Sequence, residues 1–296
     1  MAVMQYRTYP PDPRLSPYIE NYWSLGLHEE QPGDLESCIV PDGNTSLMFI
    51  RHPLRRRSVA RDSTDRYSDR CLLVGQKTQP VFYSFPAGQW VQTYGVRFRP
   101  LGLAAFLGIA QSELRDQIVD AIDLFGNTIC HLSNQLQSAR TPDGKVGYLN
   151  RFFLKQLRII TPQFRLVDQL TGQIFKQKGQ LKMADLQEIS RVSYRQMDRL
   201  FRSYLGLSPK AYARIVRFNH CVFLYRRHHF TRLTDLAYEG GYFDQMHFIK
   251  EVKYFTHETP GQYLAHAGRM APAFDELLTR RFEVKKSQTS DFYYFS

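Results

Sequence analysis

One pattern occurs twice in the C-terminal half of this 296-residue chain, and its two copies are displaced by 51 positions. Each copy has three apolar residues spaced four and then three apart, followed by a proline and a tyrosine. The copies are Met197, Phe201, Tyr204, Pro209 and Tyr212, and Phe248, Val252, Phe255, Pro260 and Tyr263. This spacing places the apolar side chains on one face of a helix. Ser208-Pro209 and Thr259-Pro260 predict where the next helix begins, because proline suits the first helical position and the preceding hydroxyl can cap it.

A shorter amphipathic helix precedes each copy. Its apolar stripe is Met183, Leu186 and Ile189 in the first copy and Leu233, Leu236 and Ala237 in the second. A turn follows, and the next helix begins at a residue suited to the N-cap: Ser193 in the first copy, and Asp244 after Gly240-Gly241 in the second. A short helix, a tight turn and a second helix form the helix-turn-helix pattern. The sequence therefore predicts two such units within residues 176–264, joined by one long helix over residues 211–225.

The outward faces of the two second helices carry residue types that contact DNA. The candidate DNA-binding residues are Arg195, Gln196, Asp198, Arg199 and Arg202 in the first copy and Gln245, Met246, Ile249, Lys250 and Lys253 in the second. In the major groove arginine pairs with guanine and glutamine with adenine, from positions near the start of a recognition helix. Arg202 and Lys253 lie further along and suit phosphates. The alternative is a pair of helical hairpins with ordinary solvated faces, but the repeat, the caps and the basic faces coincide, which favours DNA.

The formal net charge of +11 is concentrated around these units. Residues 162–270 hold 17 Lys and Arg against 9 Asp and Glu, whereas residues 1–161 hold 18 against 15 and residues 271–296 hold 4 against 4. A basic segment attracts polyanions, chiefly nucleic acid or an acidic membrane surface. A solvated basic surface is the simpler alternative. No run of eighteen apolar residues exists, so no membrane span is expected.

The N-terminal half has a different pattern, dominated by short β-rich runs and turns. The expected strands are Ser46–Ile50, Gln79–Phe85 and Val91–Phe98. Pro86-Ala87-Gly88 separates the last two strands as the connection of a hairpin would. The charged segment 51–70 is predicted to be a mobile loop. Residues 101–160 are helical in character, and Thr161-Pro162 marks the expected boundary to the helical half.

Residues 176–264 resemble the AraC/XylS family of bacterial transcription regulators. The matching stretches are Ser193-Tyr194-Arg195-Gln196-Met197-Asp198-Arg199-Leu200-Phe201, Gly206-Leu207-Ser208-Pro209, Leu236-Ala237, Gly241-Tyr242-Phe243-Asp244-Gln245, Phe248 through Lys253, and Thr259-Pro260-Gly261-Gln262-Tyr263. The resemblance implies a bipartite domain whose two recognition helices enter successive major-groove segments on one face of the DNA. Arg191 and His257 depart from the family because they replace turn glycines, and Lys250 stands where arginine is usual.

The N-terminal half resembles the sensor-type domain that precedes this module in some members of the family. The matching pieces are Pro17-Tyr18-Ile19 through Tyr22-Trp23, Pro41-Asp42-Gly43, and Gly95-Val96-Arg97-Phe98-Arg99-Pro100. This implies a small cupin-like or β-barrel-like domain for effector binding or dimerisation. Arg97 and Arg99 share one strand face and are the candidate contacts to an anionic effector, with a solvent-facing strand edge as the simpler alternative. Trp23 and Trp90 are expected in the core, with ligand stacking as the alternative.

Together these patterns predict an α+β chain in three parts. Residues 1–161 form a β-rich regulatory domain with a helical end, residues 162–267 form an all-α DNA-binding domain with two helix-turn-helix units, and residues 268–296 form a tail. The expected function is sequence-specific transcription regulation, as activator or repressor. Double-stranded DNA is the expected partner, and a small-molecule effector, RNA polymerase and a second copy of the chain are further candidates.

Enzymatic, cofactor-dependent and metal-dependent functions find no support in the sequence. Motifs for a nucleophilic serine, a zinc protease or nucleotide phosphates are missing. The four cysteines lie far apart, at Cys38, Cys71, Cys130 and Cys221, which favours reduced thiols in a cytoplasmic protein. Two alternatives stay open: a DNA-repair methyltransferase carrying the same helical unit, which would need an activated cysteine near metal-type cysteines, and a protein-interaction module.

Overall fold

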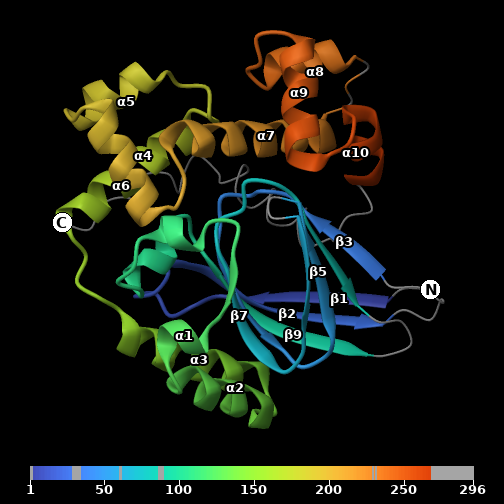
Figure 1. The fold of residues 1–296 in the computed structure, drawn as a ribbon, viewed down its shortest axis with the longest axis vertical. Coiled ribbons are helices and arrows are strands. Elements are labelled where there is room, and N and C mark those ends of the chain that lie inside the picture. Colours follow the sequence, from blue (N-terminus) through green and yellow to red (C-terminus); the bar gives the residue numbers. More distant parts are fainter. Residues whose placement is uncertain are drawn as a thin grey trace.

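The computed structural model describes residues 3–28, 35–59, 62–85, 90–228, 230 and 232–267. In it, a β-sandwich lies between two groups of helices (Figure 1). On one side are α1 (Ile122–Phe125), α2 (Thr128–Ser138) and α3 (Pro142–Gln156), and on the other are the helices of residues 162–267. The tail predicted at 268–296 lies outside the described residues.

The sandwich consists of two antiparallel sheets. Its strands are β1 (Val3–Tyr9), β2 (Ile19–His28), β3 (Leu35–Ile39), β4 (Ser46–Ile50), β5 (Leu54–Ser58), β6 (Ser63–Tyr67), β7 (Arg70–Val74), β8 (Val81–Phe85), β9 (Val91–Phe98) and β10 (Ile118–Asp120). One sheet has the order β1-β2-β9-β4-β7-β10 and the other the order β3-β8-β5-β6. Side chains from both sheets, among them Ile50, Leu72 and Tyr83, pack between them. The predicted β-rich N-terminal domain is confirmed.

Two expectations about this half are wrong. Residues 51–70 are not a loop, because β5 and β6 pair within them as an antiparallel hairpin. The buried face of β5 includes Arg56, whose Nη1 lies 3.2 Å from Asp65 Oδ2. Because a charged residue occupies an inward-facing position, β5 lacks the alternation of apolar and polar residues that would indicate a strand. The strands β8 and β9 form no hairpin either, since β8 pairs with β3 and β5 whereas β9 pairs with β2 and β4.

The C-terminal half contains both predicted helix-turn-helix units. Its helices are α4 (Pro162–Lys176), α5 (Met183–Ser190), α6 (Tyr194–Tyr204), α7 (Pro209–Arg227), α8 (Leu233–Glu239), α9 (Gln245–Thr256) and α10 (Pro260–Ala267). The first unit is α5 and α6, the second is α8 and α9, and α7 joins them. The side chains of Thr161, Ser193, Ser208 and Asp244 each accept a hydrogen bond from the first turn of the helix that follows. These local caps explain why the helix starts were predictable. Ile189, predicted to lie in the apolar stripe, is exposed.

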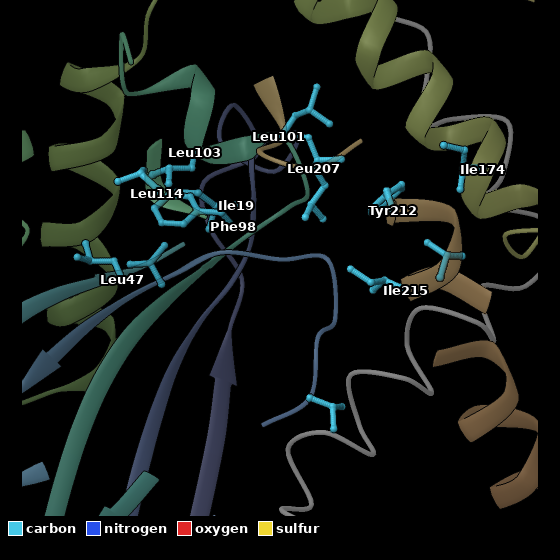
Figure 2. Close-up of a cluster of buried hydrophobic side chains, with 14 of the residues drawn as sticks. Ile19, Leu47, Phe98, Leu101, Leu103, Leu114, Ile174, Leu207, Tyr212 and Ile215 are labelled. Carbon is cyan, nitrogen blue, oxygen red and sulfur yellow. The ribbon is translucent and has the colours of Figure 1, made fainter. Parts of the chain in front are cut away.

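The two halves share one hydrophobic cluster. Figure 2 shows side chains from both halves converging: Ile19, Leu47, Phe98, Leu101, Leu103 and Leu114 with Ile174, Leu207, Tyr212 and Ile215. The turn at Pro41–Gly43 reaches α7, where Asn219 Nδ2 donates to the Pro41 carbonyl at 3.1 Å. Gly43 has a φ of +76°, and a Cβ there would lie 2.9 Å from the Tyr212 ring. Glycine therefore suits both the backbone and the close approach, and the β-rich half docks on the helix that joins the two units.

Candidate nucleic-acid interface

Helix α6 buries its apolar face in the core, so its polar face is turned outward. Met197 and Phe201 are fully buried, and Ser193 Oγ accepts a hydrogen bond from the Gln196 amide at 3.2 Å. The predicted contacts of this unit point to solvent: Arg195, Gln196, Arg199 and Arg202 are exposed and Asp198 is half-buried. The described part of the β-rich half therefore leaves these side chains open to solvent.

One ion pair lies on the outward face of α6. Arg202 Nε lies 2.7 Å from Asp198 Oδ2, one helical turn away. Asp198 lies near the middle of α6 and Arg202 near its C-terminal end, so Arg202 is away from the N-terminal turns from which base edges are usually read. Arg195 and Arg199 are the arginines nearest those turns.

Helix α9 is held in the same manner but presents a different surface. Phe248 and Val252 are buried, and Asp244 Oδ1 accepts a hydrogen bond from the His247 amide at 2.7 Å. Of the predicted contacts, Lys250 and Lys253 are exposed, Met246 is 60% exposed, and Gln245 and Ile249 are half-buried. The outward face of the second unit is thus apolar beside two lysines.

Gln245 is positioned by the other helix of its unit. The Thr234 hydroxyl in α8 donates to Gln245 Oε1 at 2.7 Å. The amide oxygen therefore has a partner inside the protein, and the Nε2 hydrogens are the donors that this side chain can offer outward. The contact depends on how two helices cross, so no local sequence pattern indicates it.

Sequence reasoning missed Phe243 on this surface. It is 85% exposed and directly precedes the N-cap residue Asp244. Its place in a predicted turn was the available signal, because turn side chains usually face solvent. Phe243, three positions before Met246, thus adds a second large exposed apolar side chain at the start of α9.

Two arginines of α7 form hydrogen bonds within the protein that hold the helix-turn-helix units in place. Arg214 Nε donates to both carboxylate oxygens of Glu251 in α9, at 2.9 and 3.1 Å. Arg217 Nη2 donates to the Gly179 carbonyl, between α4 and α5, at 2.8 Å. The burial of Arg214 acts to lower its pKa, but the hydrogen bond and charge of Glu251 outweigh this and raise it. These contacts attach each unit to the same helix, so α6 and α9 are held in one relative placement.

The candidate effector contacts Arg97 and Arg99 are engaged within the protein. Arg97 is buried, with Nε 2.7 Å from Glu20 Oε2 and Nη2 2.6 Å from Asp42 Oδ2. Burial acts to lower the pKa of Arg97, but the two carboxylates outweigh it and raise the pKa above its usual value. Arg99 Nε donates to the Ser16 carbonyl at 2.7 Å. The solvent-facing strand edge is wrong for Arg97, which is buried and pairs with the half-buried Glu20 and with the buried Asp42 in the turn that contacts α7.

A cavity of about 250 Å³ lies elsewhere, between β1, β2 and β9 and the helices α2 and α3. Its aromatic lining is Tyr9, Tyr22, Trp23, Trp90 and Tyr94, and its cationic lining is Arg7, Arg140 and Lys145. No acidic side chain is among its lining residues in the described part of the chain. Lys145 Nζ lies 4.5 Å from the centre of the Tyr94 ring, and burial lowers the pKa of this lysine. Trp90, expected in the core, is an exposed wall of this cavity.

The described ranges contain neither a metal-binding cluster nor a membrane-spanning helix. No three His, Cys, Asp or Glu side chains are grouped so that they could hold a metal ion. None of the described helices is both long and apolar enough to cross a membrane.

Comparison with known proteins matches the two halves separately. Residues 186–266 match a helix-turn-helix domain family of the AraC type, and residues 7–120 match a domain of unknown function (DUF6597). No curated protein matches the sequence.

Structures of ToxT match over most of the chain and a cupin domain over a third of it, all at low identity. ToxT from Vibrio cholerae in its P21 form is 10% identical with a TM-score of 0.48, covering 88% of this chain and 98% of ToxT. Wild-type ToxT with a bound unsaturated fatty acid is 12% identical with a TM-score of 0.44, covering 91% and 96%. A cupin domain of an XRE family regulator from Enterobacter cloacae is 15% identical with a TM-score of 0.22, covering 33% and 97%.

Proposed function

We propose that this chain, a DNA-binding transcription regulator whose residues 186–266 form an AraC-type helix-turn-helix domain, reads two successive major-groove segments with α6 and α9. The observation that carries the proposal is α7, one continuous helix of 19 residues that joins both units. At about 1.5 Å per residue this helix is roughly 28 Å long. One turn of DNA is about 34 Å long. Recognition helices attached at the two ends of α7 are therefore within reach of successive groove openings on one DNA face.

The proposal assigns different roles along α6 and α9. Arg195 lies in the first turn of α6 and Arg199 at its midpoint, and both are exposed, so their planar guanidinium groups suit guanine edges. Arg202 and Lys253 lie later in their helices, where phosphates are the usual contact. Asp198 acts through Arg202, which it holds by the ion pair.

A binding titration of the full chain against a randomised duplex library, repeated at several salt concentrations, tests these roles. Wild-type affinity should fall steeply as salt rises, because phosphate neutralisation releases counterions. Arg199→Ala should cost about 1–3 kcal/mol at the selected site and relax one or two base positions, whereas Lys253→Ala should weaken all sequences alike and reduce the salt slope by about one. Arg66→Gln removes an exposed charge from β6 and serves as control. A folded Arg199→Ala protein with unchanged base preference would show that α6 is not the reader.

For the N-terminal half we propose an effector site in the cavity between the sheet and α2–α3, in place of Arg97 and Arg99. Three cationic side chains, aromatic walls and a described lining that contains no acidic residue favour a small anion with an apolar body. Both tryptophans of the chain line this cavity, so their fluorescence should report binding. We expect 3-phenylpropionate to change the tryptophan fluorescence, whereas the neutral 3-phenylpropanamide should have little effect. Arg140→Gln should weaken the fluorescence response to 3-phenylpropionate. An equal response to both compounds would refute the charge requirement.

The methyltransferase alternative is not favoured. Its reaction needs a cysteine whose thiolate is stabilised. Cys71 and Cys221 are both buried, and burial raises the pKa of Cys221 to about 12 and that of Cys71 as well. These shifts are opposite to those of an activated nucleophile.

Two further partners stay predictions from the family resemblance, namely RNA polymerase and a second copy of the chain. Sedimentation with and without duplex DNA would decide the oligomeric state.

A further inference from the structure

The recognition surface of the second unit is apolar where that of the first is charged. Met246 and Phe243 are both largely exposed, and Ile249 follows Met246 by three positions. Met246, Ile249, Lys250 and Lys253 fall on one face of α9 because their spacing follows the helical repeat. Exposed apolar groups that cluster on a surface commonly mark a contact with a partner. The two lysines on the same face indicate that this partner is a polyanion.

The amide of Gln245 limits which base this surface can read. Glutamine pairs with adenine through both amide atoms, since the oxygen accepts from N6 while the nitrogen donates to N7. In this protein the oxygen already accepts the Thr234 hydroxyl hydrogen bond at 2.7 Å. Gln245 therefore faces the groove chiefly as a donor, which requires an acceptor on the base.

Thymine is the base whose major-groove edge fits both properties. It presents the O4 acceptor and the C5-methyl group side by side, whereas guanine has acceptors without a methyl group and cytosine has a donor. A donor from Gln245 next to the apolar side chains of Met246 and Ile249 is complementary to that pair of groups.

We propose that the second unit is a thymine reader, in which Gln245 Nε2 donates to O4 while Met246 and Ile249, with Phe243 at the edge, contact C5-methyl groups. The inference rests on the proposed function, because it requires α9 to enter the major groove. It assigns chemically different half-sites to the two units: guanine edges for α6 and thymine edges for α9.

Base analogues in the duplex test this directly. The full chain first selects its site from a randomised library, and single thymines of that site are then replaced by deoxyuridine, which lacks only the methyl group. In the half-site facing α9 we expect about four-fold weaker binding for each contacted methyl group. Deoxyuridine in the half-site facing α6 should change binding little. Replacing thymine by 5-methylcytosine keeps the methyl group but puts a donor in place of O4, and should also weaken binding in the α9 half-site.

Protein variants separate the two contributions. Met246→Gln and Ile249→Gln keep the approximate size of the side chains but replace apolar surface by an amide, so deoxyuridine should weaken their binding much less than that of the wild type. Thr234→Val releases the Gln245 oxygen and should shift one position of the selected site from thymine towards adenine. Ile159→Gln changes an exposed isoleucine outside both units and should keep the wild-type sensitivity.

Three outcomes would overturn the inference. A protein that binds its selected site equally well with every α9-side thymine replaced by deoxyuridine makes no methyl contact. A selected site without thymine preference in that half would exclude a thymine reader while leaving two-groove binding intact. Failure to bind any duplex would refute the proposed function and this inference together.

Discussion

At the scale of single residues, Asp42 connects electrostatics with the contact between the two halves. Its carboxylate lies 2.6 Å from Arg97 Nη2 and 3.4 Å from Lys77 Nζ, and all three side chains are buried. The backbone of the same turn contacts α7 through Pro41 and Gly43. A buried carboxylate of this kind keeps two cations neutralised and thereby holds the turn in place.

We therefore expect Asp42→Asn to lower the free energy of unfolding by about 3 kcal/mol, because the buried Lys77 loses the carboxylate it pairs with and the buried Arg97 keeps only Glu20. Urea denaturation at neutral pH measures this. Asp69→Asn is the matched control, since Asp69 pairs with Arg51 at 3.5 Å on the exposed surface and such pairs contribute little. Equal effects of the two substitutions would mean that the Asp42 cluster adds nothing to stability.

His220 predicts a pH dependence of stability. It is buried in α7, and burial lowers its pKa to about 4, with Lys178 acting in the same direction. The unfolded chain takes up this proton near pH 6.5 and the folded chain only near pH 4, so the free energy of unfolding should fall as pH drops through that window. Asp168 acts oppositely, because burial raises its pKa to about 6 and stability is lost as pH rises from about 4 to 6.

The contribution of His220 is isolated by comparison with a variant. His220→Asn cannot titrate, so its free energy of unfolding should decrease less than that of the wild type between pH 7 and pH 4.5. Urea denaturation at the two pH values measures the difference. Parallel pH profiles for the two proteins would refute the shifted pKa.

At the scale of helices and strands, the sequence predicted what local physics determines. The helical period and the caps at Ser193 and Asp244 are encoded within a few residues, so both helix-turn-helix units were found. The β5–β6 hairpin was not predicted, because Arg56 is buried through an ion pair with Asp65 on the neighbouring strand. The orientation of Gln245 depends on how α8 and α9 cross, and the ion pairs of Arg97 depend on residues distant in sequence, so no local pattern could indicate either.

Two helices end at non-glycine residues whose backbone is left-handed, and this yields a prediction about stability. Arg191 ends α5 with a φ of +55° and His257 ends α9 with a φ of +61°, a conformation that favours glycine. Arg191→Gly should therefore raise the free energy of unfolding by about 0.5–1 kcal/mol, whereas the control Glu188→Gly inside α5 should lower it by about 1 kcal/mol. A melting temperature lowered by both substitutions would show that the Arg191 side chain contributes more than its backbone strain.

At the scale of the whole molecule, the boundary at Thr161-Pro162 does not separate two independent cores. The hydrophobic cluster is continuous from Ile19 to Leu207 and Ile215, and Tyr204 Oη lies 2.9 Å from Thr161 Oγ1 at the boundary itself. The division at residues 161 and 162 stays a prediction about chain organisation. The shared cluster means that each half would expose apolar surface if the other were removed.

Cleavage at this boundary should consequently leave a complex. After limited proteolysis we expect the two fragments to elute together in size-exclusion chromatography and to separate only in denaturant, because the apolar surface between them is buried. Tyr212→Ala should weaken the association, while Ile159→Gln, on an exposed side chain beside the boundary, should not. Fragments that separate without denaturant would indicate two independently stable domains.

Because α7 is one continuous helix, it constrains how far the two half-sites of the DNA are rotated relative to each other about the DNA axis. Because the β-rich half and both units are attached to this helix, the spacing of α6 and α9 cannot follow a change in the DNA. One inserted base pair rotates the distal half-site by about 35° and shifts it along the axis. The duplex would have to untwist to restore both contacts, and DNA resists such deformation. A whole inserted turn restores the angle but not the distance, so the number of base pairs between half-sites becomes part of the recognition signal.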